Sequence, residues 1–325
     1  MMGSFSYVRA GSVKQAVAAL AHDGARLHAG GTDLLGCLRD RVFDAGSVVS
    51  ISGIEELGGI AALSGGSVRI GALATLAEIA SHPLIRERYP VLAEAAASAA
   101  SPQLRNQGTI GGNLCQRPRC WYFRGDFICT RKGGSLCYAF DGENRYHCIF
   151  GGDGCYIVHP SDAAPALVAL DAQVSIAGPG GSRTIAVEDL HILPKQDIRR
   201  ETSLEAGEIV TEIVVPPPRA GLRSTYRKVR ERGSWDFALV SVAIAAVVAA
   251  GKVSAARVVL GGVAPKPWRS IAAEAALIGH AIDESAAMRA AAGAVEGAQP
   301  LAQNAYKVPL LRGALEEAVM SLARP

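Results

Sequence analysis

Cysteine is concentrated in one segment of this 325-residue chain, and that concentration limits what the chain can fold into more than any other feature. Six of the seven cysteines lie between positions 115 and 155, directly after the glycine-rich motif at 109–113. Residues 121–156 also hold nine of the eighteen Phe, Trp and Tyr residues. Basic side chains accompany them at Arg117, Arg119, Arg124, Arg131, Lys132 and Arg145. One short segment therefore combines thiols, aromatic bulk and positive charge.

This combination is typical of a polynuclear iron–sulfur site, because thiolates bind iron, aromatic groups limit water and cations offset the negative charge. The cysteines are separated by 4, 8, 7, 10 and 6 residues. No Cys-x-x-Cys pair is present, which argues against ordinary structural zinc, and the spacing is looser than in ferredoxins. Zinc, disulfides and free buried thiols remain alternatives. An iron–sulfur cluster needs four of the six cysteines, so two are spare, and Cys37 is expected to be a core thiol.

Composition points to a folded protein without a nucleic-acid partner. Hydrophobic residues make up 49% and charged residues 19%, and the net charge is only +3. The first eight residues lack the basic start and apolar core of a secretory signal, so we expect reduced cysteines and a cytoplasmic location. The longest apolar run, at 237–250, is fourteen residues, and a membrane span needs about 20. We therefore expect no membrane span and interpret this run as buried sheet.

Hydrophobic periodicity predicts an α/β domain that the cysteine-rich segment interrupts, followed by a smaller α+β domain. Prolines at 216–218 indicate the linker between them. Helices are expected at 12–22, 91–100, 271–278, 284–294 and 310–322. A further helix is expected to begin near 32, and another is expected to follow Asp162 and end at 170. Strands are expected at 26–28, 48–51, 67–70, 223–229, 238–249 and 256–263, and the turn at 250–252 joins the last two as a hairpin.

Two glycine loops are candidates for binding a phosphate-bearing cofactor. The first, Gly30-Gly31-Thr32, lies between an expected strand and helix, where backbone amides can approach an anion closely. The second covers 108–113, and the pair Ser161-Asp162 follows Pro160. A simple strand-to-helix turn is the alternative for either loop. Neither has the G-x-G-x-x-G pattern, so we do not predict a Rossmann domain.

Lys228 lies in a basic stretch of an expected strand. Neighbouring side chains on a strand point to opposite faces, so either Arg227 or Lys228 can point inward at a cofactor ring. The alternative is a solvated edge strand. His147 and His159 are expected to be ordinary hydrogen-bonding residues.

Three motifs together resemble one known family. They are Ala-Gly-Gly-Thr-Asp-Leu-Leu at 29–35, Gln-Leu-Arg-Asn-Gln-Gly-Thr-Ile-Gly-Gly-Asn at 103–113 and Pro-Ser-Asp at 160–162. They resemble the FAD-binding medium subunits of molybdenum hydroxylases, the xanthine dehydrogenase family, and stretches at 226–232 and 260–269 resemble its C-terminal domain. The cysteine segment is similar to the insertion that carries a [4Fe-4S] cluster in periplasmic aldehyde oxidoreductase and 4-hydroxybenzoyl-CoA reductase.

The resemblance implies an α+β fold: a two-part FAD-binding domain of vanillyl-alcohol-oxidase type, with an iron–sulfur insertion, and a small C-terminal domain with a three-stranded sheet and helices. The boundaries would be 1–57, 58–218 with the insertion at about 115–157, and 219–325. The resemblance further implies that FAD contacts Ala29, Gly30, Gly31, Thr32, Asp33, Leu34, Ser101, Thr109, Gly112, Asn113, Ser161, Asp162 and Lys228. The cluster ligands would be Cys120, Cys129, Cys137 and Cys155, which leaves Cys115 and Cys148 spare.

The resemblance also implies an electron-transfer subunit of an oxidoreductase, with no catalytic residue of its own. A large molybdenum-cofactor subunit would act on the substrate, and a small [2Fe-2S] subunit would pass electrons to FAD. The external acceptor would be oxygen, ferredoxin, quinone or NAD. A partner with an export signal would make the location periplasmic instead. Two other readings remain: a self-contained FAD oxidase of vanillyl-alcohol-oxidase type, and a non-catalytic iron–sulfur scaffold.

Overall fold

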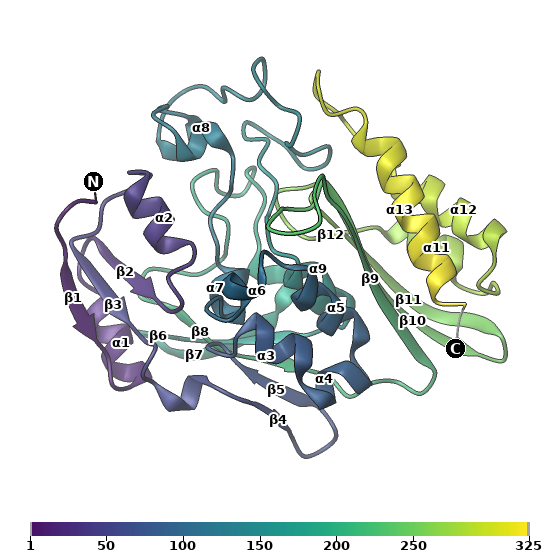
Figure 1. The fold of residues 1–325 in the computed structure, drawn as a ribbon, viewed down its shortest axis with the longest axis horizontal. Coiled ribbons are helices and arrows are strands. Elements are labelled where there is room, and N and C mark those ends of the chain that lie inside the picture. The colour runs from purple at the N-terminus through teal and green to yellow at the C-terminus, as the bar shows by residue number, and fades with distance from the viewer. Residues whose placement is uncertain (1, 324–325) are drawn as a thin grey trace.

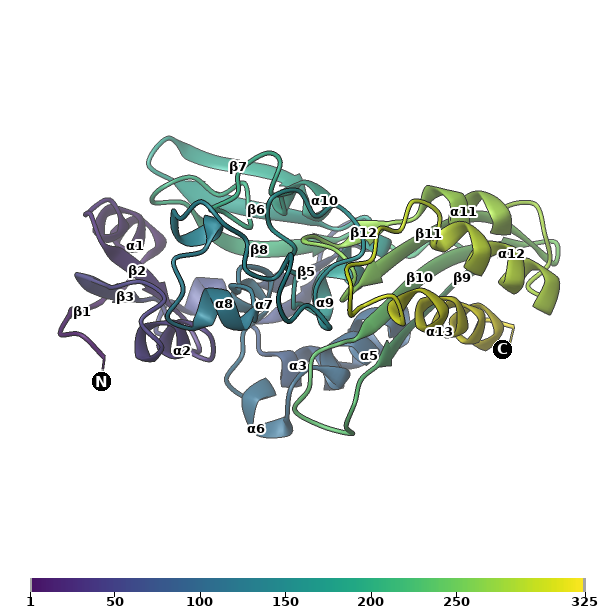
Figure 2. The same cartoon turned by 90° about the horizontal axis from the view of Figure 1, so that it is seen from above.

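The computed structural model describes residues 2–323, and three β-sheets organise them (Figure 1). Figure 2 shows the N-terminal sheet at one end of the molecule, a five-stranded sheet in the middle and the C-terminal sheet at the other end. The N-terminal sheet has the order β1-β3-β2, and both strand pairs are parallel. Its elements are β1 (Ser6–Arg9), α1 (Val13–Leu20), β2 (Ala25–His28), α2 (Leu34–Arg39) and β3 (Ser47–Ser50).

The middle sheet is antiparallel, with the order β4-β5-β8-β6-β7. Its strands are β4 (Ile60–Ala62), β5 (Val68–Gly71), β6 (Gln173–Gly178), β7 (Gly181–Ala186) and β8 (Ile209–Val215). The accompanying helices are η1 (Glu55–Leu57), α3 (Leu76–Ser81), α4 (Pro83–Arg88), α5 (Pro90–Ser98), α6 (Pro102–Arg105), α7 (Ile110–Leu114), α9 (Ala163–Ala169) and α10 (Val187–Leu190).

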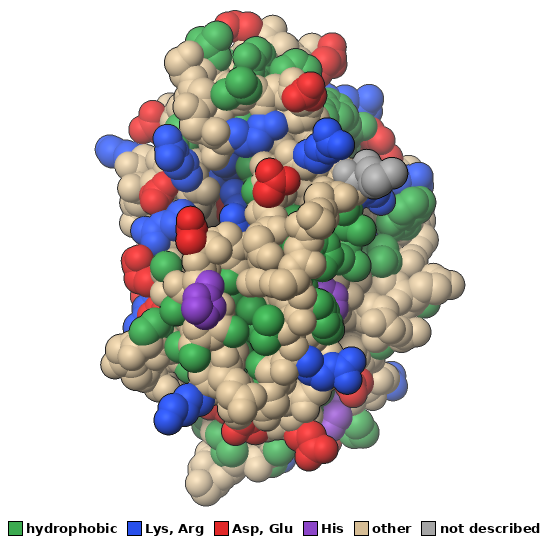
Figure 3. Space-filling view, turned by 90° about the vertical axis from the view of Figure 1, so that its left-hand side faces the viewer, with side chains coloured by type: hydrophobic (Ala, Val, Ile, Leu, Met, Phe, Trp, Pro, Cys, Tyr) green, Lys and Arg blue, Asp and Glu red, His purple; other side chains and the backbone are tan. Residues whose placement is uncertain are grey.

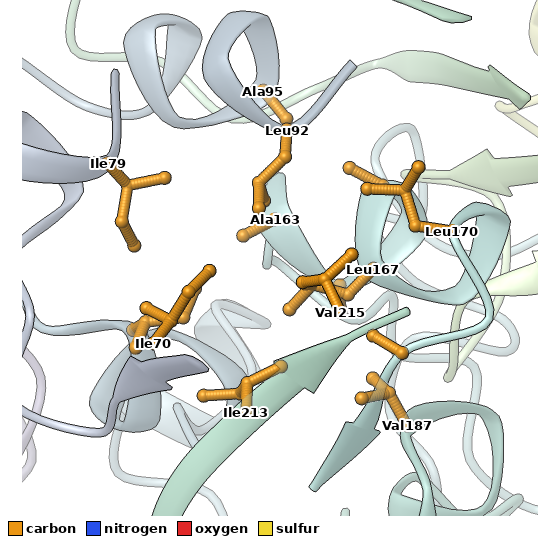
Figure 4. Packing of buried hydrophobic residues seen from close by; sticks show 14 of the residues in the cluster. Ile70, Ile79, Leu92, Ala95, Ala163, Leu167, Leu170, Val187, Ile213 and Val215 are labelled. Carbon is orange, nitrogen blue, oxygen red and sulfur yellow. The ribbon is translucent and has the colours of Figure 1, made fainter. Parts of the chain in front are cut away.

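The main core lies between the middle sheet and the helices above it. Figure 4 shows Ile70 and Ile213 from the sheet facing Ile79 and Leu92 from the helices, with Leu167 of α9 beside them. Every one of these side chains is buried. The near-complete burial of α9 explains why its sequence is apolar all round rather than amphipathic.

The C-terminal sheet has the order β12-β11-β10-β9 and is antiparallel. Alternate β10 residues pack on opposite sides: Ala243 joins the main core, whereas Val242 and Ile244 pack toward the C-terminal helices. This double burial accounts for the long apolar run at this strand. The elements are β9 (Leu222–Val229), β10 (Val240–Ala249), β11 (Lys252–Gly261), β12 (Trp268–Arg269), α11 (Ile271–Leu277), α12 (Glu284–Ala294) and α13 (Lys307–Ser321).

The cysteine segment has little regular structure of its own. It contains only α8 (Trp121–Arg124) and η2 (Thr130–Lys132) among its described residues. Buried polar side chains bind its backbone instead: Asn304 donates to the carbonyls of His147 and Cys148, and Lys307 Nζ donates to Tyr146 O at 3.1 Å. Such bonds are required because buried backbone groups need partners. They fasten the segment to the C-terminal domain.

Several predicted elements need correction. The helix expected from about Thr32 begins at Leu34, and the last helix begins at Lys307 rather than at 310. The C-terminal sheet has four strands rather than three, because the two-residue β12 pairs with β11. It was missed because it is short and follows Pro265 and Pro267. Strands β6, β7 and β8 were also not predicted.

No helix within residues 2–323 has both the length and the apolar character needed to cross a membrane. The apolar run that was interpreted as buried sheet forms the fully paired strand β10.

The core position of Ile213 predicts a large stability loss on truncation. Ile213→Ala should lower the free energy of unfolding by about 2–5 kcal/mol, because the buried side chain leaves a cavity. Chemical denaturation measures this loss. The matched control is Ile271→Ala, whose side chain is largely exposed, and it should change stability by less than about 0.5 kcal/mol. Equal effects of the two substitutions would contradict the core assignment.

Candidate functional site

Three adjoining hollows form one continuous groove along the molecule. The glycine-loop hollow, which Gly30 and Gly31 line, has a volume of about 410 Å³. The central hollow, lined by Ala99 and Ala100 among others, measures about 450 Å³. The apolar hollow, whose walls include Trp121 and Leu239, measures about 420 Å³. The first two share Thr32, Asp33, Thr109, Gly112 and Gln116. The central and apolar hollows share Arg119, Pro160, Asp162, Arg232, Asp236 and Phe237. All the predicted FAD contacts except Ser101 and Lys228 line this groove.

The glycines of the first loop are required by the protein itself. A Cβ at Gly30 would lie 1.8 Å from the carbonyl oxygen of Gln107, so the first and second loops touch through this residue. Gly31 has a backbone φ of +72°, which residues that carry a side chain rarely adopt. Close approach to a ligand was the predicted reason for these glycines. The structure adds loop contact and backbone conformation as reasons.

Asp33 ties the glycine loop to the cysteine segment. Its carboxylate accepts hydrogen bonds from the backbone N–H of Arg117 at 2.8 Å, from Arg124 at 2.7 Å and from Arg119. Burial acts to raise the pKa of Asp33, but the two guanidinium groups outweigh it and lower the pKa. Asp33 therefore stays ionised beside the groove. Figure 3 shows basic side chains, with acidic ones among them, gathered in the upper half of one face of the molecule.

The second loop is joined to the Pro-Ser-Asp motif. Thr109 Oγ1 caps α7 by accepting from the Gly112 N–H at 3.2 Å. Asn113 Oδ1 lies 2.5 Å from Ser161 Oγ, which also accepts from the Ala164 N–H at the start of α9. These short bonds hold two distant parts of the chain on one side of the groove.

Asp162 is held from below by strand β9. Lys228 Nζ donates to Asp162 Oδ2 at 2.7 Å, and Tyr226 Oη donates to Asp162 Oδ1 at 2.7 Å. The Lys228 side chain is only 3% exposed, whereas Arg227 points outward and pairs with Glu317. Lys228 is thus the inward residue of the pair. Lys228 itself does not line the groove; its ammonium group contacts Asp162, which does.

Ser101 is not brought into the groove. Its hydroxyl caps α6 by accepting from the Leu104 N–H. Its neighbours Ala99 and Ala100 do line the central hollow. The loop at 230–237, which covers this part of the groove through Arg232, Trp235 and Phe237, was not predicted. Trp235 is 65% exposed, and the only signal in the sequence was a Trp between two polar residues, Ser234 and Asp236.

A separate small cavity lies inside the cysteine segment. Its volume, compared with those of the three hollows, is only about 10 Å³, the space of about one water molecule. Its walls include the four cysteines expected from the resemblance, namely Cys120, Cys129, Cys137 and Cys155, together with aromatic rings. Cys115 lines the glycine-loop hollow instead, and neither Cys148 nor Cys37 lines the cysteine cavity. Burial raises the pKa of the Cys120 thiol to about 12, so metal binding there must release a proton.

No disulfide joins any of the seven cysteines, all of which are described. Within residues 2–323, no group of three or more His, Cys, Asp or Glu side chains is placed to hold a metal ion. The four cysteines of the cavity therefore line one space without forming a metal-binding group as they stand.

The cysteine cavity and the apolar hollow share a wall. Cys120, His147 and Ile157 line both. His147 Nε2 lies 3.2 Å from Cys120 Sγ, and burial lowers the pKa of His147 to about 4, so the ring is neutral at pH 7. A group in the apolar hollow and a group in the cysteine cavity would therefore be separated by only these side chains.

The buried ring of His159, which lines the apolar hollow, packs against the buried ring of His191. The rings of His159 and His191 meet edge to face with centroids 4.2 Å apart. His159 Nδ1 accepts from the Ser161 N–H, and His191 Nε2 lies 2.9 Å from Leu114 O. Burial lowers the pKa of His191 to about 4 and that of His159 well below its usual value. Both rings are neutral at pH 7 and position the backbone on which the groove depends.

Comparison with known proteins agrees with this geometry. Residues 3–218 match the family model described as the FAD binding domain in molybdopterin dehydrogenase. Residues 224–322 match the carbon monoxide dehydrogenase flavoprotein C-terminal domain. The two matches together extend over all three sheets, and they meet at the proline linker.

Curated relatives and solved structures give the same result. The chain is 38% identical to the aldehyde oxidoreductase FAD-binding subunit PaoB of Escherichia coli, over 97% of this chain and 96% of that subunit. It is 30% identical to the carbon monoxide dehydrogenase medium chain of Hydrogenophaga pseudoflava, over 91% of this chain and 88% of that one. A solved structure of carbon monoxide dehydrogenase from H. pseudoflava matches with a TM-score of 0.78, 29% identity and coverage of 99% and 98%.

These matches define an FAD-binding flavoprotein of mixed α/β fold. The chain belongs to the family of FAD-binding medium subunits of molybdenum hydroxylases, and it is an oxidoreductase subunit. The family resemblance found in the sequence is thereby confirmed.

The buried neutral state of His191 predicts a pH-dependent loss of stability. Its pKa is about 4 in the folded protein and about 6.5 when unfolded. The unfolded chain therefore binds more protons below pH 6.5, and lowering the pH from 7 to 5 should cost about 2 kcal/mol through this group. His191→Gln removes that titration, so its stability should fall by about 2 kcal/mol less over the same range. Denaturant unfolding at both pH values measures the difference; identical pH dependence would contradict burial of a neutral ring.

Proposed function

We propose that this chain is the FAD- and [4Fe-4S]-carrying electron-transfer subunit of a heterotrimeric molybdenum hydroxylase. FAD would occupy the groove and the cluster would occupy the cysteine cavity. The observation that carries the proposal is the shared wall of Cys120, His147 and Ile157. Neighbouring cofactor sites are what an electron-transfer subunit needs. The 38% identity with an aldehyde oxidoreductase subunit supports this class.

The groove suits an extended dinucleotide. The pyrophosphate would lie at the loop formed by Ala29, Gly30, Gly31, Thr32, Asp33 and Leu34, opposite Thr109, Gly112 and Asn113. The flavin ring would lie in the apolar hollow, whose walls include Trp121, Pro160 and Phe237. When bound, the flavin supplies a redox centre that exchanges two electrons with its partners. We propose a two-part FAD domain of vanillyl-alcohol-oxidase type, divided at 57 and 58 and ending at 218.

The residues beneath the flavin position act through Asp162. Lys228 and Tyr226 both donate to its carboxylate, so they fix its orientation toward the hollow. Asp162 would then bind the ribityl chain or ribose, with Ser161 beside it. The Lys228 ammonium would add positive charge near a ring that becomes more negative on reduction. Ser101 would contribute only through the α6 cap next to Ala100.

We propose a cubane cluster rather than zinc for the cysteine cavity. Four thiols line an aromatic-walled space, which is the ligand set such a cluster needs, and the chain lacks the Cys-x-x-Cys pair that is common in structural zinc sites. The chain's own residues would hold the cluster, limit water and supply hydrogen bonds to its sulfurs. Cys115 and Cys148 would not bind it.

We further propose that the substrate reacts on a large molybdenum-cofactor subunit and that a small [2Fe-2S] subunit delivers electrons. The acceptor would be oxygen, ferredoxin, quinone or NAD. The complex would be cytoplasmic, or periplasmic if a partner carries an export signal. Substrate turnover by the isolated chain would instead support a self-contained FAD oxidase. Full activity of the complex without FAD would support a scaffold.

A side chain added at Gly112 should block FAD without unfolding the protein. A Cβ there would meet only Thr109 Oγ1 within 4 Å, at 3.1 Å, and Gly112 faces the groove. We expect Gly112→Val to lose at least about 90% of bound FAD, a shift of about 1.4 kcal/mol or more in binding free energy. The absorbance of the purified protein measures FAD content.

The control is Gly313→Val on α13, where a Cβ would have open space. It should retain the wild-type FAD content. Full FAD in Gly112→Val would show that the cofactor does not pass this loop.

Loss of one proposed ligand should remove iron selectively. Cys129→Ser should lose most of its iron and lower the stability of the cysteine segment, because metal binding and folding are coupled. The matched substitution Cys148→Ser changes a buried thiol that does not line the cavity, and it should keep about four irons per chain. Iron analysis after anaerobic purification measures both. The reverse result would reassign the ligands.

A further inference from the structure

Arg131 is a buried arginine at the wall of the cysteine cavity. It lies on η2, and its side chain is 1% exposed. Its Nε donates a hydrogen bond to Cys155 Sγ over 3.5 Å, and its Nη1 donates to Glu201 Oε1 at 2.6 Å. One edge of the guanidinium is therefore anchored to a carboxylate, and another edge faces a thiol of the cavity.

Glu201 fixes the direction of this arginine. It is 6% exposed and comes from the segment between α10 and β8, far along the chain from the cysteines. Its second oxygen pairs with Arg117 at 2.7 Å, and Arg117 in turn lies over the Phe123 ring. Two guanidinium groups thus share one carboxylate, so the trio carries a net positive charge of one unit beside Cys155.

Cys120 and Cys137 face backbone donors, and Cys120 also lies 3.2 Å from the neutral ring nitrogen of His147. The amides of Tyr122 and Phe123 face Cys120, and those of Ala139, Phe140 and Tyr156 face Cys137. These backbone donors carry no net charge. Arg131 brings a full positive charge to a cavity sulfur, and hydrogen bonds from charged donors are about twice as strong as neutral ones.

We propose that Arg131 raises the reduction potential of the cluster by its hydrogen bond to the Cys155 thiolate, with Glu201 as the residue that positions it. The inference rests on the proposed cluster in this cavity. Adding an electron makes the site more negative, and a fixed cation at a ligand sulfur stabilises that reduced form. The side chains of Arg131 and Glu201 and the Cys155 thiol are buried, so their charges are less screened than at the surface. Arg131 therefore favours electron occupancy of the cluster.

The test compares the midpoint potential of three variants by anaerobic redox titration with EPR detection. Arg131→Met removes both the positive charge and the hydrogen bond to Cys155. Arg131→Lys keeps a positive charge that can pair with Glu201, but it lacks the planar guanidinium that donates to Glu201 and Cys155 at once. Lys132→Met is the matched control, because it removes the same charge one residue away, where Lys132 Nζ binds Gly125 O at 2.7 Å and not a cavity sulfur. Iron and FAD are measured in every sample.

The expected result is a lower midpoint potential in Arg131→Met, a smaller decrease in Arg131→Lys and a value near wild type in Lys132→Met. Equal potentials in all three variants would overturn the inference. If Arg131→Met does not fold, Arg131→Lys decides alone: a lowered potential supports the inference. A wild-type potential in that variant, or loss of its iron with FAD retained, overturns it. Absence of iron from the wild-type protein would instead end the proposed function.

Discussion

The contact between Asp33 and the arginines of the cysteine segment is the interaction on which the candidate site depends. Asp33 begins α2 at the glycine loop, and Arg119 and Arg124 lie on either side of the first cavity cysteine, Cys120. A partly buried carboxylate is costly unless it is paired, so the loop and the segment stabilise each other. Without this contact, the groove would lose one wall and Cys120 would lose its fixed place beside it.

The cysteine segment is otherwise unusual, because side chains from distant parts of the chain replace regular secondary structure. Asn304 and Lys307 bind its carbonyls from the C-terminal domain, and Glu201 binds Arg131 from the segment between α10 and β8. The Phe150 ring stacks on Trp268 of β12 with centroids 5.2 Å apart. Together with Asp33 beside the N-terminal sheet, residues near all three sheets therefore contact the cysteine segment. This placement brings the cysteine cavity against the apolar hollow, with His147 and Cys120 between them.

Much of this arrangement was visible in the sequence, and the rest had identifiable physical reasons to be hidden. Strong periodicity predicted α12 with its observed bounds, and strand alternation placed Arg227 and Lys228 on opposite faces. The alternation does not show which of these two side chains points inward, because that depends on the contact between Lys228 and Asp162, which is far away in sequence. Spacing alone left six cysteines as candidates; the family resemblance implied four of them, and the same four line the cavity in the fold. The roles of Glu201 and Lys307 depend on long-range contacts that no local pattern records.

The most direct test of the central claim is spectroscopy of the complex purified without air and enriched in an iron isotope. Mössbauer and EPR spectra distinguish a cubane cluster from the [2Fe-2S] clusters of a partner. The account predicts a [4Fe-4S] component of about four irons per copy of this chain, together with one FAD. A complex that is fully loaded with FAD and active, but lacks that component or holds zinc in its place, would contradict it.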